Sequence, residues 1–379
     1  MTVTGIICEY NPFHRGHAKQ ISHIKAQDPA GAVVCLMSGS FVQRGHPAVF
    51  SPSVRAEAAM ACGADLVLEL PVNVSLSSAE GFAAGGVEIL TKLGSDRLCF
   101  GAETKESDKL LEAAKVLLSP DFSEALRQEL DKGLSFPTAR SKAAEASGAD
   151  PEVLRRPNDI LAVEYAKAVL AQKSPMTLMP IHRPGDYHDK LADREDPSAT
   201  SLRELILANK PWLSYVPDGV GEIFAKAMPH SLAFGERAVL ARLRSMTEEE
   251  FEALPYGSEG LWRKLMHCSR EKASLEDILT GVKSKRYTRS RLDRMVMCAF
   301  LGLTQRDMEE KAPYVRILAL SGKGRQLLRQ ADSPDYFVNL GKNTEGAWGQ
   351  TERRCHRLYG LFAKEVQLFE KEKHPLIYP

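Results

Sequence analysis

Two histidines three positions apart flank a glycine near the start of the chain, in the stretch EYNPFHRGHAKQI at residues 9–21. They follow VTGIICEY, an apolar run that predicts a buried strand, and a helical pattern begins near His17. Pro12 and Gly16 mark the turn between the strand and the helix. His14 and His17 should therefore lie where a strand passes into a helix.

A helix N-terminus at the end of a buried strand binds anions, because its backbone N–H groups and the positive end of the helix dipole face the ligand. Imidazoles at the same place can donate hydrogen bonds to phosphate oxygens and stabilise the charge that develops on a pentacoordinate α-phosphorus. The alternative is that His14 and His17 only cap the helix. The spacing HxGH directly after a buried strand favours phosphate chemistry.

The elements that must position these histidines alternate between strands and helices. Strand-like runs are predicted at residues 3–9, 32–37, 65–71, 97–101 and 176–182. The runs are almost continuously apolar, which implies that both faces are covered, and helical crossovers between them imply a parallel sheet. The first half is therefore predicted to be an α/β domain with a doubly wound parallel sheet, in which ligands bind at the carboxyl ends of the strands.

Composition narrows the class of protein. The chain has 379 residues, of which 44% are hydrophobic and 26% charged, as in a globular protein with two domains. It has no run of eighteen apolar residues and no signal-peptide pattern, so we expect a cytoplasmic protein without a membrane segment. The seven cysteines are scattered, without a CxxC pair, so we expect buried thiols and no metal site.

Charge differs between the two halves of the chain. Residues 1–200 hold 21 Lys and Arg against 26 Asp and Glu, a net charge of −5, whereas residues 201–379 hold 29 against 23, a net charge of +6. From residue 206 the pattern is mainly helical, so we expect a first domain at 1–205 and a helical, basic one at 206–379. The segment KSKRYTRSRLDR at 283–294 is compatible with a polyanionic partner, although a solvated helix face explains its charge equally well.

The motif HRGH resembles the HxGH signature of the nucleotidyltransferase superfamily, whose members attack the α-phosphate of a nucleoside triphosphate and release pyrophosphate. The segment SATSLREL at 198–205 is similar to the superfamily's late Ser/Thr-rich helix start, which holds the β- and γ-phosphates. The resemblance implies this role for Ser198, Thr200, Ser201 and Arg203. Taken alone, the same segment is an ordinary helix N-cap.

Seven segments together resemble the bacterial tRNA(Met) cytidine acetate ligase family: GIICEYNPFHRGHAKQI, MSGSFVQRGHPAVF, RAEAAMACGADLVLELP, FGAE, RRPNDILAVEYAKA, HRPGDYHD and KSKRYTRSRLDR. The resemblance implies an enzyme that uses ATP to convert acetate into acetyl-adenylate, with release of pyrophosphate. It then acetylates N4 of the wobble cytidine of elongator tRNA(Met) and releases AMP. Mg²⁺ is expected to accompany ATP.

The resemblance also implies site residues. The ATP-binding segment falls on Ile7, Cys8, Glu9, Tyr10, Asn11, Pro12, Phe13, His14, Arg15, Gly16, His17, Ala18, Lys19 and Gln20, with His14 and His17 as the catalytic residues at the phosphates. Three later ATP contacts fall on Gly101, Asn158 and Arg183. Gly101 ends a strand, where a missing side chain lets a ligand approach. Asn158 caps its helix or binds ligand, and Arg183, beside Gly185, is suited to a phosphate or is a surface cation.

Recognition of tRNA requires phosphate contacts and a group that holds an exposed base. The basic segment offers Lys283, Lys285, Arg286, Arg289 and Arg291 for phosphates and Tyr287 for stacking. Gln43 and Arg44 in FVQRG are candidates on the acceptor side, unless that stretch is only a structural loop.

Two residues depart from the family pattern, because Ala102 stands where the family usually has Ser and His46 stands where it usually has Glu. If either lost group normally touches acetate or cytidine, substrate handling changes. Neither departure touches HxGH.

Three other functions remain open. An adenylyltransferase would use the HxGH domain to transfer the nucleotide to a small phosphorylated metabolite, and the basic helical half argues against it. A non-catalytic RNA-binding protein would not need the intact HxGH motif. A carboxylate–amine ligase for small molecules would need no tRNA.

Overall fold

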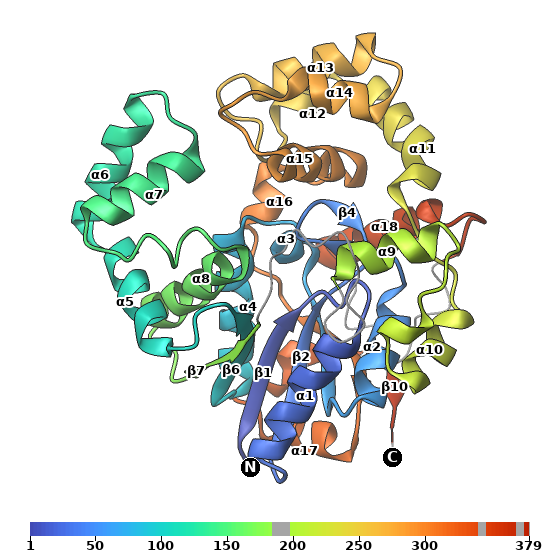
Figure 1. Cartoon of the computed structure of the whole chain (residues 1–379). Helices are drawn as coiled ribbons and strands as arrows, with labels where there is room; N and C mark the ends of the chain where they lie inside the picture. Colours follow the sequence, from blue (N-terminus) through green and yellow to red (C-terminus); the bar gives the residue numbers. More distant parts are fainter. Residues whose placement is uncertain (184–197, 340–345, 369–374, 379) are drawn as a thin grey trace.

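A mixed β-sheet forms the centre of the molecule (Figure 1). The computed structural model describes residues 1–183, 198–339, 346–368 and 375–378. The central strands are β1 (Val3–Cys8), β2 (Ala32–Ser38), β5 (Leu66–Leu70), β6 (Arg97–Ala102) and β7 (Thr177–His182). They are parallel, in the order β5-β2-β1-β6-β7. The chain leaves β1 first to one side and later to the other, so the switch point lies between β1 and β6.

Both faces of this sheet are covered by helices, as its apolar strands predict. Ile6, Val33 and Cys35 belong to one core with residues of α1 (Arg15–Gln27) and α2 (Pro52–Ala61). The alternate strand residues Ile7 and Val34 belong to a second core with α4 (Ala79–Leu93) and α8 (Pro157–Ala171). The doubly wound α/β architecture is confirmed, and each predicted strand agrees with an observed one to within one residue at either end.

The second half of the chain also contributes strands, which the expectation of a mainly helical region did not include. β8 (Val315–Leu320) runs antiparallel to β5, and β9 (Phe337–Val338) and β10 (Leu376–Ile377) pair parallel with β8. The sheet is therefore mixed, not wholly parallel. The apolar run VRILAL signals a strand, but only long-range pairing to the edge of β5 shows that it joins this sheet. The division at residue 205 stays a prediction.

Most of the other helices form two groups around the sheet (Figure 1). α5 (Ser107–Leu117), α6 (Pro120–Asp131) and α7 (Phe136–Ala146) lie between β6 and α8 in the chain. The helical cap, residues 232–309, contains α11 (Leu232–Ser245), α12 (Glu248–Glu252), α13 (Leu261–Glu271), α14 (Leu275–Val282), α15 (Arg289–Leu301) and α16 (Gln305–Glu309). In Figure 1 the arrowheads of β1 and β2 point towards this cap.

Within the described residues, a hairpin and five further helices remain. They are the hairpin β3 (Phe41–Val42) and β4 (His46–Pro47), and the helices α3 (Val72–Ser75), α9 (Ala199–Leu207), α10 (Asp218–Ala225), α17 (Gly322–Gln330) and α18 (Ala347–Tyr359). Single 3-10 turns lie at Leu213–Tyr215, Pro334–Tyr336 and Gly360–Phe362. Within the described residues, no helix combines the length and the apolar character needed to cross a membrane.

Candidate active site

The loop between β1 and α1 lies at the switch point of the sheet. It turns sharply at Tyr10, whose φ is 46°, and contains a cis peptide bond between Asn11 and Pro12. Asn11 ties the loop to the chain before α2, because its Oδ1 accepts a hydrogen bond of 2.7 Å from the backbone N–H of Val49. The rings of Tyr10 and Phe13 pack edge to face with centroids 4.8 Å apart. The loop is thus held rigidly by buried side chains.

His14 and His17 form a stacked pair at the start of α1, with ring centroids 3.7 Å apart. His14 is the N-cap, and its Nδ1 accepts a hydrogen bond of 3.1 Å from the backbone N–H of Gly16. Nδ1 of His17 accepts a hydrogen bond of 3.3 Å from the backbone N–H of His14. Since both Nδ1 atoms are acceptors, the proton of each neutral ring resides on Nε2. The capping and phosphate-binding roles proposed from the sequence therefore use different atoms of the same rings.

Burial keeps both imidazoles neutral. It lowers the pKa of His14 to about 3, and the positive charge of Arg183 adds to this effect. The pKa of His17 is also lowered well below its usual value, first by burial and then by His14 and Arg183. Neither Nε2 has a hydrogen-bond partner among the described residues. The site therefore holds two neutral N–H donors beside a cation.

Gly101 and Arg183 lie together, at the ends of the neighbouring strands β6 and β7. The backbone N–H of Arg183 donates a hydrogen bond of 2.9 Å to the carbonyl of Ala102. A Cβ atom on Gly101 would lie 2.7 Å from Cδ of Arg183, so the arginine side chain crosses the glycine. Gly101 thus allows Arg183 to lie close to the backbone of β6. The rest of HRPGDYHD after Arg183, including Gly185, lies outside the described residues.

Asn158 lies at the start of α8, where it is bound to the loop after β6. Its Nδ2 donates to Oε1 of Glu103 at 2.7 Å, and Oε2 of the same carboxylate accepts from the backbone N–H of Asp159 at 2.9 Å. Asp159 in turn accepts hydrogen bonds from the backbone N–H groups of Glu103 and Thr104, at 2.8 and 2.9 Å, and from the hydroxyl of Thr104 at 2.8 Å. This reciprocal clamp places Asn158 beside the end of β6.

The late Ser/Thr-rich segment also reaches the loop after β1. Ser198 caps α9, because its Oγ accepts a hydrogen bond of 3.1 Å from the backbone N–H of Ser201. Arg203 donates from Nη1 to the carbonyl of Asn11 at 2.6 Å and from Nη2 to Oγ1 of Thr200 at 3.0 Å. Residues almost two hundred positions apart thus share one site.

Three residues of the predicted ATP segment have other protein partners or face solvent. Arg15 donates from Nε to the carbonyl of Ser214 at 3.0 Å and pairs with Asp218 at 3.5 Å, so its side chain is bound to the region of α10. Nε2 of Gln20 lies 3.5 Å from Sγ of Cys99. Lys19 is exposed.

The FVQRG stretch is the tip of the β3–β4 hairpin, and it bridges the site to α15. The backbone N–H of Gln43 donates to Oε1 of Glu9 at 2.7 Å, while its carbonyl accepts from Nη1 of Arg294 at 3.3 Å. Gly45, with a φ of 80°, packs so closely on α15 that a Cβ atom would lie 2.5 Å from the backbone N of Arg294. Arg44 is exposed at the same tip. The departure His46 lies 3.7 Å from the carboxylate of Asp293, and Ala102 is buried in the core shared with α4 and α8.

The basic segment contains fewer available charges than its composition indicates. Arg286 and Tyr287 both donate to the carboxylate of Glu259, at 2.8 and 2.7 Å. Arg289 makes a bidentate pair with Glu276, at 2.8 and 2.7 Å.

Arg291 donates to the carbonyl of Tyr256 at 3.0 Å and to the hydroxyl of Ser258 at 2.9 Å. Lys283 and Lys285 are exposed. The lysines are therefore better placed than the arginines to meet a phosphate.

Arg55 is a structural residue of the site that the sequence did not single out. It is completely buried and donates from Nε to the carbonyl of Phe50 at 2.9 Å and from Nη1 to the carbonyls of Glu9 and Ser38 at 2.6 and 2.9 Å. Nη2 bonds the carbonyl of Gly39. The guanidinium thus joins the ends of β1 and β2. Its only signal was an arginine among the apolar residues of VRAEAAM.

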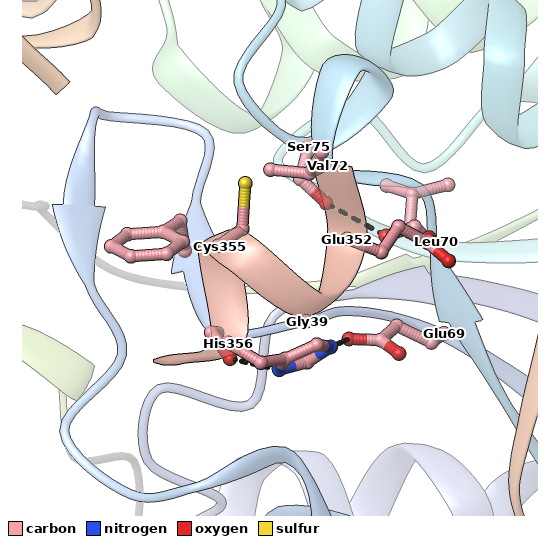
Figure 2. A pocket seen from close by; sticks show the side chains of 10 residues that line it. Gly39, Glu69, Leu70, Val72, Ser75, Glu352, Cys355 and His356 are labelled. Atoms are coloured by element: carbon pink, nitrogen blue, oxygen red, sulfur yellow. Dashed lines mark hydrogen bonds and ion pairs between the residues drawn. The ribbon is translucent and has the colours of Figure 1, made fainter. Parts of the chain in front are cut away.

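A separate buried cluster lies between β5, β8 and α18. Figure 2 shows two of its residues, Glu69 and His356. Glu69 pairs with Nε of Arg316 at 2.7 Å and with Nε2 of His356 at 3.2 Å. Burial opposes the ionisation of Glu69, but these two partners outweigh it and lower its pKa to about 2. The adjoining cavity has a volume of about 20 Å³, which is room for one water and not for a nucleotide.

Among the described residues there is no group of three or more His, Cys, Asp or Glu side chains that could hold a metal ion. The donors of the site suit an anion instead. A divalent cation that enters with a triphosphate needs few protein ligands, because phosphate oxygens and water complete its octahedral shell.

The chain is similar to known proteins over nearly all of its length. The family model described as HIGH Nucleotidyl Transferase matches residues 1–373. A tRNA(Met) cytidine acetate ligase of Clostridium novyi (strain NT) is 35% identical over 349 residues, which cover 87% of each chain. One of Acetivibrio thermocellus is 33% identical over 362 residues, covering 87% of this chain and 85% of the relative. One of Thermosipho melanesiensis is 36% identical over 345 residues, covering 86% and 81%.

Two crystal structures of Thermotoga maritima TmcAL share the fold at 29% sequence identity and cover 100% of this chain and 99% of theirs. The apo structure, form I, superposes with a TM-score of 0.91. The structure bound with alpha-thio ATP superposes with a TM-score of 0.89.

Proposed function

The chain belongs to the tRNA(Met) cytidine acetate ligase family of HIGH nucleotidyltransferases, and from this premise we propose that it acetylates a cytidine of tRNA(Met) at the expense of ATP. Acetate is the acyl donor in this proposal, and the acceptor is N4 of the wobble cytidine of the elongator tRNA. The names of the relatives and the alpha-thio ATP complex of TmcAL support the ligase chemistry and the nucleotide.

The first step joins acetate to AMP. A carboxylate oxygen of acetate attacks the α-phosphorus of ATP, and the bond to the β-phosphate oxygen breaks with release of pyrophosphate. Negative charge accumulates on the oxygens around the α-phosphorus, so donors fixed in advance lower the barrier. The paired Nε2–H groups of His14 and His17, held at the N-terminus of α1, are such donors.

This pair is the observation that carries the proposal. A histidine that only capped α1 would need one ring nitrogen. Here the buried ring of His14 and the half-buried ring of His17 are stacked, and the second nitrogen of each is free of protein partners among the described residues. Because the rings are neutral, two N–H donors meet the triphosphate without a histidine having to gain a proton first. Arg183 supplies the full positive charge nearby.

The remaining residues surround this centre. Gly101 and Asn158 mark the end of β6, where the base or ribose can approach the backbone, and the loop from Ile7 to Gln20 surrounds the phosphates. Ser198, Thr200, Ser201 and Arg203 reach the same loop through the bond from Arg203 to Asn11 and are proposed for the β- and γ-phosphates. Mg²⁺ is proposed to enter with ATP, where it neutralises phosphate charge.

The second step transfers the acetyl group to RNA. The N4 amine of cytidine is a weak nucleophile, because its lone pair is delocalised into the ring, so the acetyl group must be activated as the mixed anhydride. Holding the adenylate and the base together supplies much of the remaining rate. The hairpin residues Gln43 and Arg44, together with the basic segment, are the proposed RNA contacts. Within that segment, the exposed Lys283 and Lys285 are the strongest candidates.

Two measurements test the proposed function. Acetate-dependent exchange of labelled pyrophosphate into ATP should occur without RNA, and mass spectrometry should find N4-acetylcytidine at the wobble position after incubation with unmodified tRNA(Met). Exchange that requires a phosphorylated metabolite in place of acetate would identify an adenylyltransferase instead. Acetylation of a small amine without tRNA would identify a small-molecule ligase.

A further inference from the structure

The second step requires a base, because the cytidine nitrogen gains positive charge as it attacks and must lose a proton. We propose that Glu9 is this general base, an inference that rests on the proposed function. Among the described residues, several titratable side chains lie near the carboxyl ends of β1, β2, β5 and β6, and they differ in whether they can accept a proton.

The two histidines are unsuited to this task. A neutral imidazole has one lone pair in the ring plane, on the nitrogen that carries no proton. In both His14 and His17 that nitrogen is Nδ1, and it already accepts a backbone N–H. Burial further disfavours their protonated form. They can donate hydrogen bonds to phosphate but have no free lone pair with which to take up a proton.

Three other carboxylates near the strand ends are fully engaged. Both oxygens of Glu103 accept hydrogen bonds from the start of α8. Both oxygens of Asp159 accept hydrogen bonds from the loop after β6. Glu69 is buried in an ion pair with Arg316 and His356. Protonation of any of the three would break contacts that hold the fold together.

Glu9 differs from these three carboxylates because only one of its oxygens is used. Oε1 accepts the backbone N–H of Gln43 at 2.7 Å, and Oε2 has no hydrogen bond or ion pair to the described residues. Glu9 is half-buried, and Oε2 is not one of the buried polar atoms that lack a hydrogen-bond partner, so it is accessible. The backbone is fixed as well, because the Glu9 carbonyl accepts from Arg55 at 2.6 Å. A carboxylate held at both ends with one oxygen free is preorganised to accept a proton.

The location of Glu9 also fits the transfer step. It lies five residues before His14 in the loop proposed to bind ATP, and it contacts the hairpin tip on the other side. That tip packs on α15, whose first residues, from Arg289 to Arg294, are the second half of the basic segment. Figure 1 shows β4 of this hairpin between the sheet and α15. Glu9 is therefore the described carboxylate that joins the nucleotide loop to the proposed RNA-binding side.

The step balances without any further reactant. The N4 lone pair forms a bond to the acetyl carbon, and the bond between that carbon and the phosphate oxygen breaks, so AMP leaves with the electron pair. The proton from N4 passes to Oε2 of Glu9. Solvent takes up this proton after the product dissociates, which restores the carboxylate.

The variant Glu9→Gln tests this role, because its amide oxygen can still accept from Gln43 but cannot take up a proton. Glu9 also belongs to the loop proposed to bind ATP, so the informative quantity is the ratio of the two reactions. Adenylate formation needs no base, so acetate-dependent pyrophosphate exchange should lose far less of its rate than transfer does. Single-turnover transfer of labelled acetate to tRNA(Met) should fall by about 100-fold or more.

Two further variants separate catalysis from folding. Glu9→Asp keeps a carboxylate and should recover part of the transfer rate. The control variant Glu57→Gln changes a half-buried carboxylate on α2. Glu57 lies near Tyr378, which follows the edge strand β10, so this change should alter neither reaction.

Normal transfer by Glu9→Gln would overturn the proposal. Equal loss of exchange and transfer would also overturn it, because the Glu9 side chain would then act only through the nucleotide and not as a base in the transfer step. Failure of the proposed function is a distinct result, since the wild-type protein itself would then show no acetate-dependent exchange.

Discussion

Replacement of His17 by asparagine or by glutamine separates the two roles of this ring, which are to cap the helix through Nδ1 and to donate a hydrogen bond to phosphate through Nε2. The side-chain oxygen of asparagine reaches the position of Nδ1, so His17→Asn keeps the acceptor for the backbone N–H of His14 and loses the distal donor. In His17→Gln the amide nitrogen reaches the region of Nε2, so the distal donor remains and the cap is lost. Both variants lose the ring stacked 3.7 Å from His14, so a difference in activity or stability between the two variants cannot come from the lost stacking.

The two contributions have different magnitudes. The capping bond to His14 is 3.3 Å long, and such a bond contributes about 0.5–1 kcal/mol to stability. A fixed donor that stabilises developing charge is worth about 2.7–4 kcal/mol in the transition state, or 100- to 1,000-fold in rate. We therefore expect His17→Asn to unfold at nearly the wild-type temperature but to lose about two to three orders of magnitude in exchange rate. His17→Gln should be less stable and yet about tenfold more active than His17→Asn.

The assay is acetate-dependent exchange of labelled pyrophosphate at saturating ATP, with thermal unfolding measured on the same preparations. Full exchange activity in His17→Asn would show that His17 is only a helix cap. A lower rate in His17→Gln than in His17→Asn would refute the assignment of the donor to Nε2. In both cases the proposed chemistry of the first step would need another donor.

Three further predictions concern other parts of the molecule. Burial, and then repulsion by a neighbouring carboxylate, raise the pKa of Glu352 to about 7. The native state thus keeps a proton that the unfolded chain releases, so stability should fall as pH rises from about 4.5 to 7. Glu352→Gln should therefore raise the unfolding temperature at pH 8 and change it little at pH 5. Gly101→Ala would place a methyl group 2.7 Å from Cδ of Arg183, so KM for ATP should rise several-fold without a large loss of stability, as steady-state exchange kinetics can show. Replacing Lys283 and Lys285 together by alanine should weaken tRNA binding and reduce the slope of log affinity against log salt by about one for each phosphate that is no longer bound, measured by filter binding.

Local patterns in the sequence were sufficient to predict the strands and the turn that position the nucleotide site. Apolar runs located the five central strands β1, β2, β5, β6 and β7, because burial on both faces leaves few positions for polar residues. Pro12 located the turn, and the strand-to-helix transition placed HxGH at the carboxyl end of β1. The expected helix start near His17 was two residues late, because α1 begins at Arg15 and Gly16 lies within its first turn. These features depend on residues close together in the chain, which is why periodicity and turn chemistry reveal them.

Contacts between distant segments could not be obtained in this way. The bond from Arg203 to Asn11 spans 192 positions, and Arg55 bonds to the ends of two strands that only the fold brings together. The strand VRILAL was recognisable by composition, but its antiparallel pairing with β5 depends on an edge formed by residues about 250 positions earlier.

The basic segment shows most clearly why contacts between distant residues could not be obtained from the sequence. By itself the sequence determined that six cations and a tyrosine lie within twelve residues, which is a statement about charge density. Only the tertiary structure decided that Glu259 and Glu276 neutralise Arg286 and Arg289, while Lys283 and Lys285 stay exposed. Charge and hydrophobicity are properties of single residues, so the sequence specifies them directly. The partner of a charged side chain depends on how the helices pack, and the local sequence pattern does not determine that packing.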